Sequence, residues 1–350
     1  MPIVSKGAPF RYKGAINVEN CQTAEEVIKQ ANLDWSVEKC PIFGQMPMSI
    51  NQSEITDNES FIHDYKYYAN VPNAYGIYRT DLNIPLGIVK DRYNIVQNID
   101  AFTFFNEAIG KDKAIWQTAG YFGNGERIFV SAKIPKSIFV DDDPVENYLV
   151  FTTSHDGSSG VKILFTPIRI VCQNTLNAAI ENSSNYISFR HTNSVHDNIK
   201  VVTDIIRASN TKVESLSEAY NAMRKVKVKD EDAMEYFTKL ILSENELENL
   251  RVTGHTAQEI IYKNFEAMND ANISTKKVNV ISSMYDYYHT GIGQKDILGS
   301  GWGLYNAVSG YYSNIDNAVG LKRMDSLLYG DKSKKIQRAG DIVLDMIKSA

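Results

Sequence analysis

Alternation of polar and apolar positions, a period of two, is typical of half-buried β-strands and occurs near the middle of the chain. In NYISFRHT (185–192), for example, Ile187 and Phe189 fall on one face and polar residues fall on the other. Other stretches rich in β-branched and aromatic residues lie between turn signals. We expect strands at residues 74–80, 85–93, 147–153, 161–172 and 185–192, with two more in 116–134.

Further along the chain the apolar period changes to that of amphipathic helices. One stripe, with spacings of four, three and four residues, consists of Val195, Ile199, Val202 and Ile206. Caps and glycines bound several other helical patterns. We expect further helices at residues 23–32, 98–110, 173–182, 232–242, 256–271, 302–314 and 336–350.

The order of these elements predicts the fold class. Strands come first and helices second, so we expect an α+β fold with a mostly antiparallel sheet in the N-terminal two-thirds, followed by a helical C-terminal part. Short, turn-rich connections between the strands favour antiparallel pairing. We predict a poorly defined N-terminal region (1–70), a β-rich core (71–193) and a helical region packed on it (194–350).

Composition and charge exclude several classes of protein. Of the 350 residues, 43% are hydrophobic and 23% are charged, as in soluble globular proteins. The net charge of −5 gives no overall attraction to nucleic acid, so a nucleic-acid site must be a local patch. We find no bilayer-length apolar run, no apolar core of a signal peptide, and no zinc-type spacing of the cysteines. We therefore expect a cytoplasmic protein without membrane segment, cofactor or metal.

Candidate chemistry gathers in TPIRIVCQNTLNAAI (166–180), where an apolar strand pattern gives way to small residues. Cys172 would need a nearby base to act as a nucleophile, and free cysteines are among the most buried residues, so packing is its favoured role. Asn174 or Thr175 has the side-chain oxygen that a helix N-cap needs. Arg169 is a permanent cation in an apolar strand and needs a carboxylate or an anionic ligand such as a phosphate.

Histidines beside charged residues offer a second candidate site. His155-Asp156 has the residue types of a general base and its orienting carboxylate, although Asp-Gly also suits a hairpin turn, which we favour. Arg190-His191 ends a predicted strand. His196 follows at a spacing of five, whereas paired helical metal ligands need four, so we expect no metal site. The alternative pocket would gather His155, Asp156, Arg169, Cys172, Asn174, Arg190 and His191.

The densest basic cluster is RKVKVK (224–229), which contains Lys225, Lys227 and Lys229. Such a cluster is typical of a solvated helix face, and it also suits contacts with phosphates. Tyrosines are abundant, at 20, and exposed ones beside cations can stack unpaired bases. The glycines of 291–303 lack the Gly-Lys-Ser/Thr ending of a phosphate loop, so we expect a flexible entry to the next helix.

Several blocks of the sequence, taken in order, carry a family resemblance. They are LGIVKDRYNIVQN (86–98), TAGYFGNGERIFVSAKIP (118–135), YLVFTTSHDGSSG (148–160), TPIRIVCQNTLNAAI (166–180), ISFRHT (187–192) and GWGLYNAVSGYYSN (301–314). Together they resemble the phage/plasmid-like protein family, a domain-of-unknown-function family of phages, plasmids and laterally transferred islands. The resemblance implies a mobile-element origin and a cytoplasmic location, and it carries no assigned reaction.

The association of that family with phage DNA metabolism implies a role in replication or recombination. With arginines set in apolar strands, it leads us to expect a non-enzymatic homo-oligomer that binds single-stranded nucleic acid and promotes annealing. The expected nucleic-acid contacts are Arg169, Arg190, Lys225, Lys227 and Lys229. Two alternatives stay open, namely an enzyme or nucleotide-binding protein that uses the pocket named above, and a binding protein that counters host defence.

Overall fold

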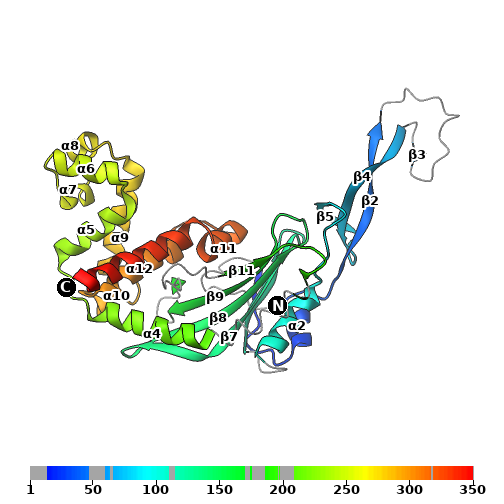
Figure 1. The fold of residues 1–350 in the computed structure, drawn as a ribbon, viewed down its shortest axis with the longest axis horizontal. Helices are drawn as coiled ribbons and strands as arrows, with labels where there is room; N and C mark the ends of the chain where they lie inside the picture. The colour runs from blue at the N-terminus through cyan, green and yellow to red at the C-terminus, as the bar shows by residue number, and fades with distance from the viewer. Residues whose placement is uncertain are drawn as a thin grey trace.

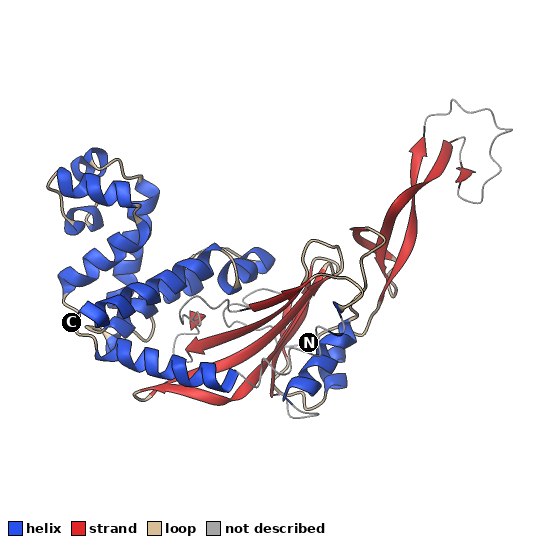
Figure 2. Ribbon diagram, in the orientation of Figure 1, coloured by secondary structure: helices blue, strands red, loops and turns tan. Residues whose placement is uncertain are grey.

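The computed structural model describes residues 14–46, 60–63, 66–109, 115–169, 174–175, 186–195, 197, 209–316 and 318–349. In these residues strands dominate the first half and helices the second, which confirms the predicted α+β class (Figure 2). A main sheet with helices on both faces forms the body, and a second sheet projects from it as an arm (Figure 1).

Every pairing in the main sheet is antiparallel, in the order β1-β6-β7-β8-β9, with β10 and β11 both on the outer edge of β9. The strands are β1 (Ala15–Asn17), β6 (Ile115–Phe122), β7 (Arg127–Val140), β8 (Asp143–Ser154), β9 (Val161–Arg169), β10 (Asn174–Thr175) and β11 (Tyr186–Phe189). The predicted hairpin between β6 and β7 turns at Gly123 and Gly125, whose φ angles of 61° and 123° suit glycine.

Helices make up most of the second half of the chain. Two of the described α-helices lie in the first half, α1 (Ala24–Gln30) and α2 (Asn98–Ile109). Those of the second half are α4 (Ser209–Lys225), α5 (Asp230–Ile241), α6 (Glu244–Val252), α7 (Ala257–Ile261), α8 (Phe265–Asp270), α9 (Thr275–Thr290), α10 (Gly301–Gly310), α11 (Gly320–Leu328) and α12 (Asp331–Ser349). As predicted, Thr23 caps α1 by accepting a hydrogen bond from the Glu26 N–H (3.2 Å). Within the described residues, no helix combines the length and the apolar character that a membrane span requires.

Alternation along the central strands gives the main sheet two apolar faces. On one face Phe151 of β8 packs against Phe104 of α2, with ring centroids 5.7 Å apart. On the other face Phe129 and Leu164 belong to a cluster with Leu328 of α11. The hydrophobic effect therefore holds helices to both faces of the sheet.

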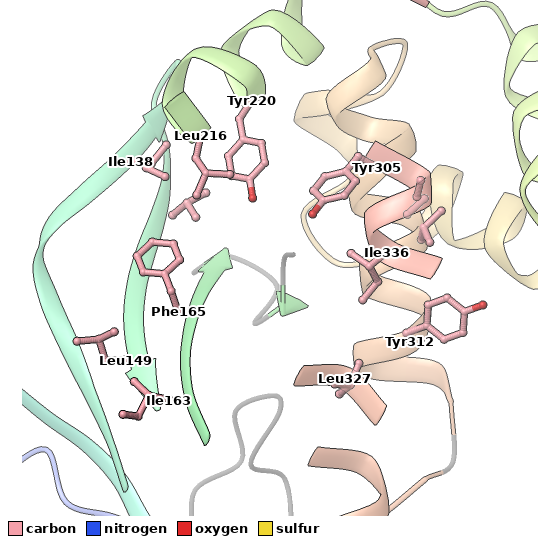
Figure 3. Packing of buried hydrophobic residues seen from close by; sticks show 14 of the residues in the cluster. Ile138, Leu149, Ile163, Phe165, Leu216, Tyr220, Tyr305, Tyr312, Leu327 and Ile336 are labelled. Atoms are coloured by element: carbon pink, nitrogen blue, oxygen red, sulfur yellow. The ribbon is translucent and has the colours of Figure 1, made fainter. Parts of the chain in front are cut away.

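Helix α10 lies at the centre of the helical half, and all ten of its residues are buried. A helix that is buried all round needs neighbours on every side, and α4, α9 and α12 provide them. In Figure 3 Tyr220 of α4 and Tyr305 of α10 lie between apolar side chains of the sheet and of the helices, with ring centroids 5.9 Å apart. The helical half thus has a core of its own that continues into that of the sheet.

The arm extends away from the body in Figure 1. It consists of β2 (Val37–Met46), β3 (Ser60–His63), β4 (Lys66–Arg79) and β5 (Ile84–Val89), and β4 pairs with each of the others. The strands predicted at 74–80 and 85–93 correspond to the end of β4 and to β5. Strand β5 brings the chain back from the arm to the body.

Two helix predictions need correction. The helix expected over 173–182 does not include Asn174 and Thr175, which form β10 because the outer edge of β9 offers backbone partners there. The cap role of Asn174 or Thr175 stays a prediction, since residues 176–182 lie outside the described ones. The helix expected over 256–271 is two helices, α7 and α8, because Lys263 adopts a φ of 59°, which ends the first. Asn264 then caps the second by accepting from the Glu266 N–H (2.9 Å).

Some predictions fall outside the described residues. They concern Cys172, His196, residues 176–182 and the apolar stripe beyond Val195. Val195 itself is described and is buried.

His255 links two of the short helices that follow α5. Its Nδ1 lies 3.2 Å from a carboxylate oxygen of Glu259, and its Nε2 lies 3.1 Å from one of Asp270. Only the protonated ring can donate at both nitrogens. These two hydrogen bonds, that of Asp270 first, raise the pKa of His255 above its usual 6.5.

We predict that this link weakens in alkaline solution. Because the folded pKa is raised, the stability that His255 contributes is fully present below pH 6.5 and is lost as the pH rises through the folded value. Hydrogen exchange of the amides of residues 244–271, corrected for the pH dependence of the intrinsic exchange rate, should show a free energy of local opening that decreases as the pH rises. His255→Gln should remove this dependence, and an equal dependence in that variant would contradict it.

Two residues of α2 provide a matched test of the core. Phe104 is fully buried, whereas Ile99 is 52% exposed. We expect Phe104→Ala to lower the free energy of unfolding by about 3–5 kcal/mol, and Ile99→Ala to change it by less than about 0.5 kcal/mol. Urea unfolding followed by circular dichroism measures both, and similar losses in the two variants would show that α2 does not depend on its buried face.

Candidate functional site

Three separate segments line one open cleft of about 500 Å³ at the end of the main sheet. They are residues 88–93 after and within β5, residues 157–160 between β8 and β9, and residues 190–192 after β11. The pairing of Phe189 with Val161 places the second and third segments together. Strand β5 delivers the first from the arm. The cleft is therefore built by long-range strand pairing.

The loop between β8 and β9 (154–160) is held by its own hydrogen bonds. Asp156 accepts from the Ser158 N–H (2.9 Å), and the Ser154 hydroxyl accepts from the Ser159 N–H (2.9 Å) and donates to the Ser159 carbonyl (2.6 Å). Gly157 has a φ of 75°, which favours glycine. Asp156-Gly157 thus supplies turn geometry, and the loop has a fixed shape before any ligand binds.

His191 forms one wall of the cleft. Its Nδ1 lies 3.1 Å from the Asn94 carbonyl, which can only accept, so Nδ1 carries the proton. In the neutral ring Nε2 then accepts from the Thr153 hydroxyl, 3.2 Å away. The ring also stacks on Tyr93 at 4.5 Å, and the Tyr93 hydroxyl donates to the Ser154 carbonyl (2.6 Å). Both ring nitrogens are therefore engaged in holding the three segments together.

His155 points into the core rather than into the cleft. It is fully buried, and its Nε2 donates to Oδ1 of Asn98 (2.9 Å). The Asn98 amide nitrogen, Nδ2, donates in turn to the carbonyls of Leu33 and Trp35. Burial, followed by the neighbouring His191, lowers the pKa of His155 to about 3. The ring is therefore neutral at physiological pH and serves packing rather than acid–base chemistry at the cleft.

Three cations surround the cleft. Lys90, Arg92 and Arg190 all line it, and all three are exposed. Among the described residues none of them forms an ion pair with a carboxylate. A cleft with three such cations attracts anions, above all phosphates, for which arginine has matching donors.

Of these residues the sequence singled out Arg190 and His191 and missed Lys90, Arg92 and Tyr93. The signal for the others was the block KDRY (90–93), where two cations and an aromatic residue end the strand predicted over 85–93.

The other predicted site residues lie elsewhere. Arg169 and Asn174 pair with each other at the far end of β9, eight residues from Val161 and roughly 26 Å along the strand at about 3.3 Å per residue. Their side chains are outside the described residues, as is the whole of Cys172. Of the alternative pocket, the structure thus gathers His155, Asp156, Arg190 and His191 in one neighbourhood.

The predicted lysines lie on the segment that joins α4 to α5. Lys225, Lys227 and Lys229 are exposed and alternate with half-buried valines. Backbone hydrogen bonds hold the segment, since the Val228 N–H donates to the Gly299 carbonyl (3.0 Å). In Figure 1 the junction of α4 and α5 lies on the opposite side of the body from β5, and Ile88 and Val89 of β5 line the cleft. The two basic surfaces are therefore separate.

The described residues contain no group of three or more histidine, cysteine, aspartate or glutamate side chains placed to hold a metal ion. The cleft therefore offers cations and hydroxyls to a ligand, together with the ordered loop 154–160.

The buried His155 predicts a loss of stability in acid. Because its folded pKa of about 3 lies below the usual 6.5, the unfolded chain takes up a proton first as the pH falls. Its contribution is present above pH 6.5 and decreases toward pH 3 by about 1.4 kcal/mol per pH unit. We expect a smaller acid dependence of urea unfolding in His155→Gln, and an imidazole NMR titration of His155 near pH 6.5 would contradict this account.

Comparison with curated proteins and with solved structures found no match. The family model described as "Domain of unknown function (DUF932)" matches residues 85–339. The matched range includes all three segments of the cleft and extends through the helical half to α12. Because it covers more than half of the chain, this protein belongs to the DUF932 family.

Proposed function

We propose that the protein binds single-stranded nucleic acid at the cleft, without catalysing a reaction, in the DNA metabolism of phages, plasmids or related mobile elements. The observation that carries the proposal is the set of three cations, Lys90, Arg92 and Arg190, around one preformed loop. The resemblance to phage/plasmid-like proteins supports the biological setting and a cytoplasmic location.

The size of the cleft favours a single strand over a duplex. A hollow of about 500 Å³ lies in the range of small-ligand sites, which accommodates a nucleotide or two rather than a double helix. Proteins that bind single strands combine such a cationic groove with aromatic side chains. Tyr93 and His191, which stack on each other, provide an aromatic wall.

The second basic surface, Lys225, Lys227 and Lys229, suits the proposed homo-oligomer. These lysines lie at the junction of α4 and α5, on the opposite side of the body from β5, which contributes to the lining of the cleft. In an oligomer the cleft of one copy and the lysines of the next would follow one strand, as annealing requires. Arg169, at the end of β9 far from the cleft, remains a proposed contact.

Fluorescence anisotropy with a labelled oligothymidine tests the proposal. We expect binding that weakens with salt between about 50 and 200 mM, with a slope of log K against log salt near −0.7 for each phosphate contact. Arg190→Gln and Arg92→Gln should each reduce that slope by about 0.7. Lys276→Gln, at an exposed lysine of α9, is the matched control and should leave it unchanged.

Two results would overturn the proposal. One is the absence of binding by the unmodified protein at low salt. The other is a slope that falls in Lys276→Gln as much as in the cleft variants. A further variant with glutamine at residues 225, 227 and 229 measures the contribution of the second surface separately.

A nucleotide-binding protein is the second candidate, favoured by the ordered Ser/Gly loop that lines a ligand-sized cleft. Competition distinguishes the two. A free mononucleotide at millimolar concentration would displace the labelled oligothymidine if the cleft is a nucleotide site. It would leave the oligothymidine bound if affinity comes from several phosphates along one strand.

A further inference from the structure

A buried arginine joins the helical half of the protein to the loop of the cleft. Arg127, the first residue of β7, donates through Nη1 to both carboxylate oxygens of Asp325 on α11, at 2.6 Å each. The same nitrogen donates to the Tyr329 hydroxyl (3.1 Å), which in turn donates to Asp325. Residues 127 and 325 are thus held together across nearly two hundred residues of chain.

The second terminal nitrogen of the same guanidinium contacts a residue that lines the cleft. Nη2 of Arg127 donates to the hydroxyl of Ser158 at 3.5 Å, and Ser158 lines the cleft. The remaining donor, Nε, is buried and has no acceptor among the described residues. Burying a guanidinium with one donor unmatched is costly, and the pair with Asp325 offsets that cost.

The end of α11 is seated where it can influence the loop. Lys162 places its Nζ 3.6 Å from the centre of the Tyr329 ring, and the Tyr186 ring lies 5.6 Å from that ring. Lys162 is the second residue of β9, directly after the loop, and Tyr186 begins β11, which leads to Arg190. Tyr329 therefore contacts β9 and β11, the two strands that adjoin the loop and the 190–192 segment of the cleft.

The geometry points to Arg127 as a positioning residue: it holds the 154–160 loop in its binding shape and makes that shape depend on the docking of α11 through Asp325. Arg127 does not line the cleft, so it acts on a ligand only through Ser158. The inference rests on the proposed function for its ligand, and its structural part stands without a ligand.

Hydrogen exchange on the free, full-length protein tests the structural part. In Arg127→Met we expect the amides of the loop, including those of Ser158 and Ser159, to exchange at least about tenfold faster, with the centre of β8 unchanged. Asp325→Asn should produce the same change in the loop. Arg224→Met is the matched control, since Arg224 pairs with Asp141 (3.1 Å) away from the cleft.

Arg127→Lys separates positioning from simple anchoring. A lysine reaches one acceptor as a point charge and cannot fork between Asp325 and Ser158. We expect it to restore the protection of α11 but not that of the loop. If Arg127→Met leaves loop exchange unchanged, or if Arg127→Lys restores loop and helix alike, Arg127 only anchors α11 and the inference is overturned.

Binding of the labelled oligothymidine gives a second, separable result. Arg127→Met should weaken binding about tenfold without changing the slope of log K against log salt, because no phosphate contact is lost. A changed slope would make Arg127 a direct contact and would overturn the positioning role. If the unmodified protein does not bind, the proposed function fails, while the exchange experiment still decides how the loop is held.

Discussion

The pairing of β9 with β8 on one edge and with β11 on the other is the constraint on which the rest of the site depends. It places the loop that leaves β8 beside the segment that leaves β11, although they are some thirty residues apart. The side chains of β9 are buried on both faces, with Ile163 and Phe165 in one hydrophobic cluster and Leu164 in the other, so its register is fixed by burial. A shift of one residue would turn Ile163 and Leu164 to the wrong faces.

Burial also assigns different roles to neighbouring polar residues. His155 and His191 are both buried, and each is held by hydrogen bonds that connect elements of the fold. The cations at the cleft are instead exposed and, among the described residues, unpaired with carboxylates. The groups proposed to bind a ligand are thus distinct from the groups that shape the cleft, and we assign Arg127 to the second kind.

Local patterns predicted much of the fold and only part of the site. The β-branched and aromatic residues of β5, β8 and β9, the alternation in β11 and the helical spacing in α2 are each properties of one element, so the sequence shows them directly. The union of KDRY (90–93) with Arg190 depends on register between distant strands, which no local pattern encodes. The strand at Asn174 was not predicted, because an asparagine side chain suits a helix cap and a strand edge alike. The break between α7 and α8 was not predicted either, because no sequence pattern indicates the positive φ of Lys263.

The central claim is that the cleft holds the nucleic acid. Photocrosslinking of an oligothymidine that carries a photoreactive base, followed by mass spectrometry, tests this most directly. The account predicts crosslinks in residues 88–93, 157–160 and 190–192, and their loss at high salt. Crosslinks confined to residues 225–229 or to the arm, with none at the cleft, would contradict it.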